Sequence, residues 1–461
     1  MVRALNTLRT LSAAVLAASI LTTGCGSKSS SQTADVGSVV NINSVALLAS
    51  ISNIQQPVAK ALAGWDWDSY INSFGPLLSN LKYSLDMQKV TYQSTGADGK
   101  LHSMTGLLIL PKSILGDKPS VPILMYQHGT EVYRRFSPSQ YIKHLDSPKD
   151  YPEVMVAAAI AAKGYAVALV DYEGMGDNTG TQPHVVGAVL AKQVVDLLRA
   201  SRDIIGGTAG SASSPCKWNN QLFLMGYSEG GYVTMATTRE LQLPKYASEF
   251  TVTASAPLSG PHDLSGVMRG IILSDNTFKA PYFAPLLLTG YNYAYGGQTT
   301  NFSPAFAMLS PYSTTIPPLF DGNSQSDKIS EAMGMTFSPV KLIVPKSILT
   351  QQFIDQLTSV TSPVFTLLQQ NDSYRGWVPT VPMRMIHHKN DELVPYGNSQ
   401  AAFNSFSTAG AKNRIPRGPG VELIEETATI NISTDPVKTV HFGSAFPELS
   451  NGWKWLDGFK K

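Results

Sequence analysis

Cysteine is scarce in this chain, with only Cys25 and Cys216 among 461 residues. A fold held together by several disulfides is therefore excluded. Charge is scarce as well: 15% of the residues are charged and the formal net charge is +2, so nothing predicts a nucleic-acid partner. A hydrophobic content of 43% is instead typical of a globular protein with a sizeable core.

Residues 1–24 show the pattern of an export signal peptide. A basic start leads into an apolar stretch at residues 11–21, which is too short to span a bilayer as a stable helix, and Gly24 then precedes Cys25. Bacterial lipoprotein signals place their acylated cysteine at this point, although they usually carry leucine where this chain has Thr22. We expect a protein exported from a bacterial cell and anchored by a lipid on Cys25, facing the periplasm or the cell surface. Ordinary secretion is the alternative.

Short apolar strands alternate with helices over most of the chain. We expect strands at residues 88–95, 101–110, 121–127, 165–170, 221–225, 251–258, 381–387 and 421–427, the first two as a hairpin. We expect helices at residues 154–162, 185–200, 280–288, 363–370 and 445–459, and another beginning at residue 231. Such alternation predicts an α/β fold with a mostly parallel central sheet and helices on both faces. Catalytic groups gather at the carboxyl ends of the strands in sheets of this kind.

The stretch Gly226-Tyr227-Ser228-Glu229-Gly230 lies between a predicted strand and a predicted helix. A sharp turn there would hold the serine hydroxyl clear of its own backbone. The glycines are needed because side chains at their positions would collide with the neighbouring strand and helix. We therefore interpret Ser228 as a nucleophile, which requires a base, an acid and an oxyanion hole elsewhere in the chain.

His441 is the predicted base among eight histidines. In an α/β-hydrolase sheet the order along the chain is serine, acid, histidine, and the histidine lies on the loop after the last strand. His102, His144 and His184 precede the serine and are poor candidates. His128 belongs to the loop expected to form the oxyanion hole. His262, His387 and His388 are expected to be structural.

Asp391 is the predicted acid, because it stands just past a late strand in a turn that Asn390 favours. Glu392 then points elsewhere. Asp263, which follows the preceding strand, is the rival. Asp171 precedes the serine and is expected to brace a loop.

Two backbone N–H groups are needed to stabilise negative charge on the substrate oxygen. One is expected from Glu229, and the other from Thr130 or Gly129 in the loop after residues 121–127. The Glu229 side chain is expected to be a bystander; the alternative is that it braces the mouth of the site or meets a polar group of the substrate.

The alternation stops between residues 261 and 380. A break of about 120 residues between two sheet strands is far longer than an ordinary loop, so we expect a helical cap over the active site. Its apolar side chains either line an acyl pocket or, as expected for most of them, form the cap's own core. They are Tyr282, Phe283, Leu286, Leu287, Phe302, Phe306 and Phe365. The expected layout is a signal at 1–24, a tether and N-terminal segment at 25–80, a catalytic core at 81–260 and 381–461, and the cap at 261–380.

These motifs together resemble the α/β-hydrolase superfamily. They are Gln127-His128-Gly129-Thr130, Asp171-Tyr172-Glu173-Gly174-Met175-Gly176, the Ser228 pentapeptide, Asp391 and His441. Over residues 85–461 the chain is similar to secreted lipases and esterases of the secretory-lipase type, which share the Asp-Tyr-Glu-Gly loop. The resemblance implies a carboxylic ester hydrolase that acts on an ester or lipid through a Ser-Asp-His triad and an acyl-enzyme, without a cofactor or metal. The alternatives are an exported serine peptidase or amidase of the same fold and a catalytically silent binding protein on the cell surface.

Overall fold

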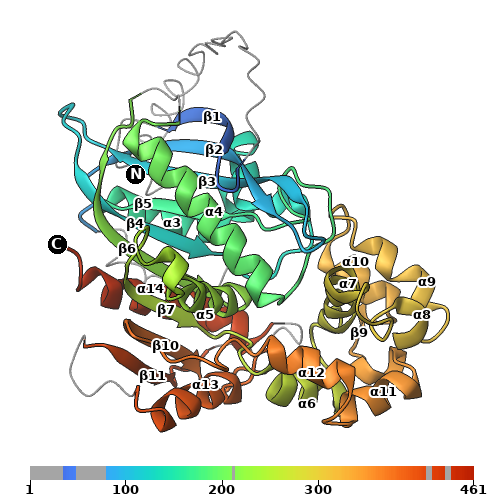
Figure 1. Ribbon diagram of the computed structural model, residues 1–461. Helices are drawn as coiled ribbons and strands as arrows, with labels where there is room; N and C mark the ends of the chain where they lie inside the picture. The colour runs from blue at the N-terminus through green and yellow to red at the C-terminus, as the bar shows by residue number, and fades with distance from the viewer. Residues whose placement is uncertain (1–34, 48–78, 210–212, 412–417, 431–437) are drawn as a thin grey trace, which may run out of the picture. The chain divides into compact units, whose positions relative to one another are not determined.

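A nine-stranded sheet forms the centre of the fold (Figure 1). The structure is a computed structural model that describes residues 35–47, 79–209, 213–411, 418–430 and 438–461. The strand order from edge to edge is β1-β2-β3-β5-β4-β6-β7-β10-β11. The strands are β1 (Val39–Leu47), β2 (Ser84–Thr95), β3 (Leu101–Lys112), β4 (Ser120–Gln127), β5 (Ala166–Val170), β6 (Lys217–Tyr227), β7 (Val252–Leu258), β10 (Pro382–His388) and β11 (Gly420–Glu426).

The sheet is mostly parallel, as predicted. All neighbouring strands from β5 through β11 pair in parallel, whereas β1–β2, β2–β3 and β3–β5 are antiparallel. The predicted hairpin at 88–95 and 101–110 is present as β2 and β3. The carboxyl ends of β4, β6, β7 and β10 therefore meet at one edge of the sheet, and the loops that follow these strands come together there.

Residues 39–47 are a strand and not part of the predicted tether at 25–80. They form β1, which pairs antiparallel with β2 so that Ile42 lies opposite Val90. An edge strand gains its hydrogen bonds from one neighbour and needs little apolar surface of its own; Val40, for example, is 54% exposed. Because the hydrogen bonds that make β1 a strand come from β2, the sequence of residues 39–47 alone does not clearly predict a strand.

Helices cover both faces of the sheet. Helices α3 (Pro152–Ala162) and α14 (Val440–Asp457) pack on one face, and α4 (Gly187–Gly206), α5 (Glu229–Leu241) and α13 (Gly397–Thr408) pack on the other. Successive residues of β3 show the alternation, since Leu107 belongs to the core under α3 and Leu108 to the core under α4. Both faces are thus apolar, which accounts for the nearly continuous apolar strands.

The chain between β7 and β10 is largely helical, and Figure 1 draws it in yellow and orange as a group beside the sheet. Its helices are α6 (Arg269–Leu273), α7 (Phe283–Tyr295), α8 (Pro304–Ala307), α9 (Tyr312–Thr315), α10 (Ser326–Ala332), α11 (Gln351–Thr358) and α12 (Pro363–Gln370), with a small hairpin of β8 (Thr336–Phe337) and β9 (Val340–Lys341). Helix α12 has the predicted bounds and the predicted cap, because the Ser362 hydroxyl accepts the Phe365 N–H at 3.0 Å. Helix α7 begins at Phe283 and not at residue 280. This start places Pro285 in the first turn, where its missing N–H costs no helical hydrogen bond.

Several predictions concern residues that the structure does not describe. The export signal at 1–24, Cys25 and most of the segment at 25–80 lie outside the described residues. Within the described residues, no helix is both long and apolar enough to cross a bilayer.

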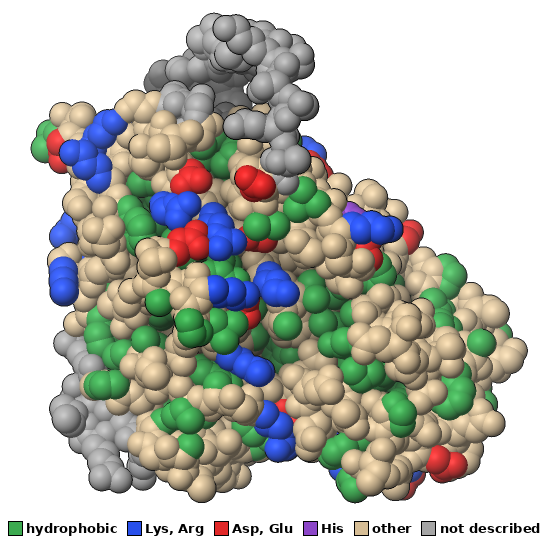
Figure 2. Space-filling model, in the orientation of Figure 1, with side chains coloured by type: hydrophobic (Ala, Val, Ile, Leu, Met, Phe, Trp, Pro, Cys, Tyr) green, Lys and Arg blue, Asp and Glu red, His purple; other side chains and the backbone are tan. Residues whose placement is uncertain are grey.

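Basic and acidic side chains are interspersed on the face drawn in Figure 2. Arg199 and Arg202 on α4 both form ion pairs with Glu249, at 2.7 Å and 3.1 Å. Such pairs on a partly exposed helix contribute little to stability.

Candidate active site

Ser228 stands on the turn between β6 and α5. Its backbone has φ 61° and ψ −126°, a strained conformation for a residue with a side chain, and its N–H donates to the carbonyl of Leu258 at 3.0 Å. The surrounding backbone closes tightly on the turn, because a Cβ added to Gly230 would lie 1.9 Å from the carbonyl oxygen of Gln127. Only glycine fits at that position, which is the physical reason for the glycine in the motif.

The side chains of Ser228, His441 and Asp391 form one hydrogen-bonded line. His441 Nε2 lies 2.8 Å from Ser228 Oγ, and His441 Nδ1 lies 2.5 Å from Asp391 Oδ2. All three residues are buried. With Nδ1 bound to the carboxylate, the other ring nitrogen is left facing the serine hydroxyl, which is the arrangement a general base requires. The chain thus brings together the three residues that were expected to meet.

His441 lies in the first turn of α14 and not on the predicted loop before that helix. The helix begins at Val440, because the Thr439 hydroxyl caps it by accepting the N–H of Phe442 at 3.0 Å. Glu392, in the turn after β10, caps it a second time and accepts the Val440 N–H at 2.9 Å. The Glu392 carboxylate thus hydrogen-bonds to the backbone of the helix that carries His441, a contact that the sequence did not predict.

Asp391 is held in place by its own turn and by a second histidine. Its Oδ1 accepts the N–H groups of Leu393 and Val394 at 3.0 and 2.8 Å, and its Oδ2 lies 3.4 Å from His387 Nε2. Burial alone would raise the pKa of Asp391, but the charge of His441 and the contacts with both histidines hold that pKa well below its usual value. Asp391 is therefore a carboxylate that can stabilise a protonated His441.

The rival acid, Asp263, is engaged elsewhere. Its Oδ2 accepts the N–H of Val267 at 3.0 Å, and its Oδ1 accepts the Tyr374 hydroxyl at 3.0 Å. Its neighbour His262 is enclosed, and burial lowers the pKa of His262 to about 3, so this ring stays neutral. Among the described residues, neither side chain hydrogen-bonds to His441.

Other residues singled out from the sequence have structural contacts. Asp171 braces its loop, because its Oδ2 accepts the Thr105 hydroxyl at 2.6 Å and its Oδ1 accepts the Ser139 N–H at 2.9 Å. His388 lies at the end of β10, and its Nε2 donates to the carbonyl of Ala428 at 2.8 Å.

The candidate oxyanion hole lies between the loop after β4 and the start of α5. Of the two predicted alternatives in this loop, Gly129 already donates its N–H to the Glu153 carboxylate, at 3.2 and 3.3 Å to the two oxygens. The N–H groups of Thr130 and Glu229 have no acceptor in the described part of the chain. Both residues line a cavity with Ser228, so these two amides are the available donors.

Two cavities meet at Ser228. The first, the apolar cavity, contains Thr130, His184 and Glu229 beside Ser228 and is otherwise lined by apolar groups that include Val185, Leu264, Ile271, Phe278, Phe283 and Leu287. The second, the His441 cavity, has a volume of about 390 Å³ and is lined by Ser228, His441, Tyr227, Phe442 and Glu131 among others. His441 borders only the second cavity.

The side chains predicted for an acyl pocket divide between these cavities and the interior of the helical segment. Phe283 lines both cavities, Leu287 lines the apolar cavity and Tyr282 lines the His441 cavity. The remaining four line neither cavity: Leu286, Phe302, Phe306 and Phe365. Phe302, for instance, is fully buried against other rings of the segment.

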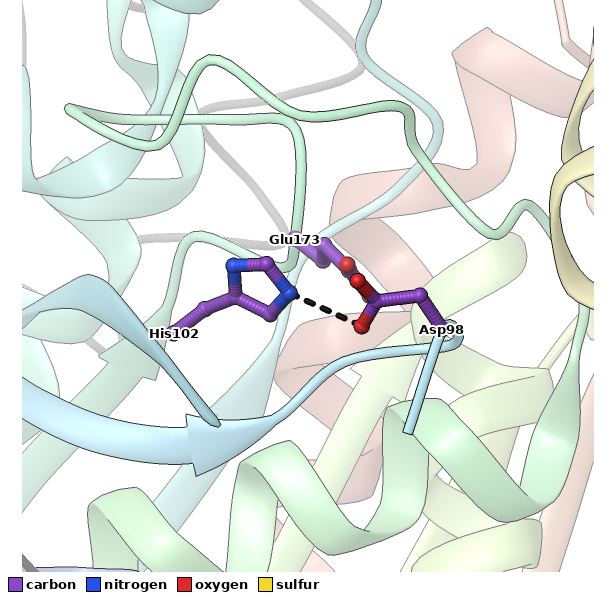
Figure 3. A group of neighbouring side chains, drawn as sticks. All are labelled: Asp98, His102 and Glu173. Carbon is purple, nitrogen blue, oxygen red and sulfur yellow. Dashed lines mark hydrogen bonds and ion pairs between the residues drawn. The ribbon is translucent and has the colours of Figure 1, made fainter. Parts of the chain in front are cut away.

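One further group among the described residues has the composition of a metal site (Figure 3). His102 Nε2 and Asp98 Oδ1 face each other at 2.9 Å, and Glu173 approaches Asp98 from the loop after β5. The Glu173 carboxylate is already occupied, since it accepts the Tyr293 hydroxyl at 2.6 Å and the Ala97 N–H at 2.9 Å. These hydrogen bonds explain the cluster as a structural link between the β2–β3 turn, this loop and α7, and we assign no ion to it.

Comparison with known families gives one match within the chain. Residues 148–292 match the model of a family described as secretory lipase. The matched residues run from before α3 into α7 and include the Ser228 turn. A comparison with curated proteins finds no match.

Comparison with solved structures gives matches over most of the chain. The rice cell wall degrading esterase LipA from Xanthomonas oryzae superposes with a TM-score of 0.71 at 23% identity, covering 92% of this chain and 99% of that one. A protein from Legionella pneumophila gives a TM-score of 0.70 at 23% identity, covering 91% of this chain and 98% of that one. Lipase A from Candida antarctica gives 0.56 at 16% identity, covering 86% and 77%. At these identities the likeness establishes the fold, and the predicted α/β-hydrolase fold is confirmed.

The cap that Glu392 places on α14 can be tested by Glu392→Ala. Loss of a helix cap should cost about 1 kcal/mol of stability. Because His441 lies in the turn that loses its cap, kcat should also fall, by about tenfold, as the ring is held less accurately. Ester hydrolysis and the melting temperature would be measured together. Glu425→Ala is the matched control, since the ion pair that Glu425 forms within the described residues is with the exposed Lys389, at 3.0 Å, and both quantities should stay near wild type. A lower melting temperature with an unchanged kcat would show that His441 is positioned without this cap.

Proposed function

We propose that this α/β-hydrolase of the secretory-lipase type, a carboxylic ester hydrolase, cleaves its substrates with a Ser228–His441–Asp391 triad. The observation that carries the proposal is the continuous line of hydrogen bonds, 2.8 Å from Ser228 to His441 and 2.5 Å from His441 to Asp391. The nucleophile, the base and the charge stabilisation all come from the chain's own residues.

The proposed reaction is a two-step acyl transfer. Ser228 Oγ attacks the ester carbonyl carbon while His441 Nε2 takes its proton, and Asp391 stabilises the imidazolium that forms. His441 then gives the proton to the leaving alcohol, which leaves an acyl group on Ser228. Water attacks this acyl-enzyme with His441 again as base, and the carboxylic acid is released.

Negative charge develops on the carbonyl oxygen in each step. We assign its stabilisation to the backbone N–H groups of Thr130 and Glu229, which are unoccupied and line the same cavity as Ser228. The Gly129 N–H donates to the Glu153 carboxylate, and this hydrogen bond links the loop after β4 to α3.

The position of His441 indicates which cavity binds the acyl group of the ester and which binds the alcohol. Because His441 must protonate the leaving oxygen, the alcohol belongs in the His441 cavity, and the acyl group then points into the apolar cavity. The apolar lining favours an acyl group with a hydrocarbon chain. We propose that the segment at 261–380 acts as a cap, since Phe283 on α7 borders both cavities at Ser228.

Replacing Ser228 by alanine tests the nucleophile directly. Ser228→Ala should lower kcat for p-nitrophenyl esters by at least about 10⁴-fold while the melting temperature stays close to wild type. A fluorophosphonate probe should label the wild type and fail to label the variant. Ser347→Ala removes an exposed serine and should keep both activity and labelling. Labelling of Ser228→Ala, or hydrolysis at the wild-type rate, would refute the assignment.

We also propose that the protein is exported and held at a membrane by a lipid on Cys25. The proposal is supported by the signal-like residues 1–24 and by the secretory character of the matched family. Cys25→Ser should abolish incorporation of labelled palmitate in bacterial cells and move the protein from the membrane fraction to the soluble fraction. Cys216→Ser is the matched control and should keep the label, because Cys216 is buried. Retention of the label by Cys25→Ser would contradict the lipid anchor.

A further inference from the structure

The apolar cavity contains one ionisable pair that the reaction does not use. His184 Nδ1 lies 2.9 Å from Glu229 Oε1, and their side chains are 8% and 0% exposed. Both residues line the cavity beside Ser228, whose other walls are almost entirely apolar. A charged pair at the end of an apolar cavity is costly to bury, so it calls for a reason.

The Glu229 carboxylate depends on His184 for compensation. Burial would raise the pKa of Glu229, but the charge of His184, its contact with the carboxylate, and smaller contributions from His128 and Thr130 lower that pKa below its usual value. Neither carboxylate oxygen has a partner in hydrogen-bond geometry among the described residues. The carboxylate is therefore ionised and is balanced chiefly by the imidazole beside it.

His184 is held in one orientation. Its Nδ1 faces Glu229. Its backbone packs closely against α7, because a Cβ added to Gly290 would lie 2.8 Å from the backbone nitrogen of His184. Its ring lies 6.3 Å from that of Phe283, centre to centre. The Glu229 carboxylate lies on the Nδ1 side of the ring, so the far nitrogen, Nε2, points away from it.

The far nitrogen, Nε2, is the part of His184 that remains available. None of the described residues forms a hydrogen bond with Nε2. Nδ1 is a fully buried atom without a partner in hydrogen-bond geometry, whereas Nε2 is not among the fully buried atoms of this kind. His184 borders the apolar cavity together with Thr130 and Glu229, so an acyl chain in that cavity would run past its ring. A plain hydrocarbon chain that covered Nε2 would leave it without a partner, which is unfavourable.

We propose that His184, oriented by Glu229, binds a hydroxyl group on the acyl chain within a few carbons of the scissile carbonyl, so that the preferred substrates are esters of hydroxy acids. The assignment rests on the proposed function, because it takes the apolar cavity as the acyl side. A hydroxyl suits Nε2 in either protonation state, since it can donate to the neutral nitrogen or accept from the protonated one. The hydroxyl is expected within a few carbons of the scissile carbonyl because His184 contacts Glu229, and Glu229 is the residue next to the nucleophile Ser228.

The test compares kcat/KM for p-nitrophenyl 3-hydroxybutyrate with that for p-nitrophenyl butyrate. The wild type should favour the hydroxy ester by about tenfold or more, because the plain ester leaves a buried polar group unpaired. His184→Phe should remove most of this preference, and because it also leaves the Glu229 carboxylate uncompensated, the readout is the ratio of the two esters and not the rate of either one. His184→Gln, which restores a polar group, should recover part of the preference. Glu131→Gln alters the His441 cavity and should leave the ratio of the two esters unchanged.

Three results would overturn the inference. They are a wild-type ratio near one, a ratio that His184→Phe does not alter, and a stronger preference for the 3-aminobutyrate ester that survives in His184→Phe, which would point to Glu229 binding an ammonium group. Melting temperatures and fluorophosphonate labelling show that each variant is folded with a working nucleophile. If hydrolysis and labelling persist in Ser228→Ala, the proposed function itself fails; if only the ester ratio fails, the hydrolase assignment stands.

Discussion

His441 and Asp391 are 50 residues apart in the chain, yet their side chains meet at 2.5 Å in a buried setting. This hydrogen bond selects which nitrogen of His441 faces Ser228 and supplies the negative charge that a protonated ring needs. Without it, Ser228 would be a strained serine beside a freely tautomerising histidine. In the proposed mechanism, the tight turn that holds Ser228, the cap on α14 and the two cavities all depend on this contact, because it orients the base.

The surrounding structure holds the contact from several sides. Glu448 on α14 accepts the His388 N–H at 2.9 Å and the Ser259 hydroxyl at 2.7 Å, and so ties the helix of His441 to the ends of β10 and β7. Burial, and to a smaller extent the nearby charge of Asp391, raise the pKa of Glu448 well above its usual value. The Tyr227 hydroxyl, next to the nucleophile in sequence, donates to the carbonyl of His441 at 2.5 Å.

The sequence was most informative where one residue type answers to a local constraint. Gly230 and Ser228 could be interpreted from a tight turn alone, and Asp391 was preferred to Asp263 because it follows a later strand, in a turn that Asn390 favours. Contacts between distant elements could not be predicted in this way. The Gly129 N–H is engaged by Glu153 on α3, β1 is a strand because β2 pairs with it, and His184 lies against Glu229. Each of these contacts involves a residue far away in the sequence, which a local sequence pattern does not identify.

The most direct test of the account is kcat for Asp391→Asn, with Asp263→Asn measured beside it. An amide at position 391 keeps the shape of the side chain but removes its charge and favours the wrong tautomer of His441, so kcat should fall by about 10⁴-fold. At position 263 the amide can still cap the following turn, and kcat should stay near the wild-type value. Equal losses in the two variants, or a loss confined to Asp263→Asn, would contradict the assignment of Asp391 as the residue that orients the base.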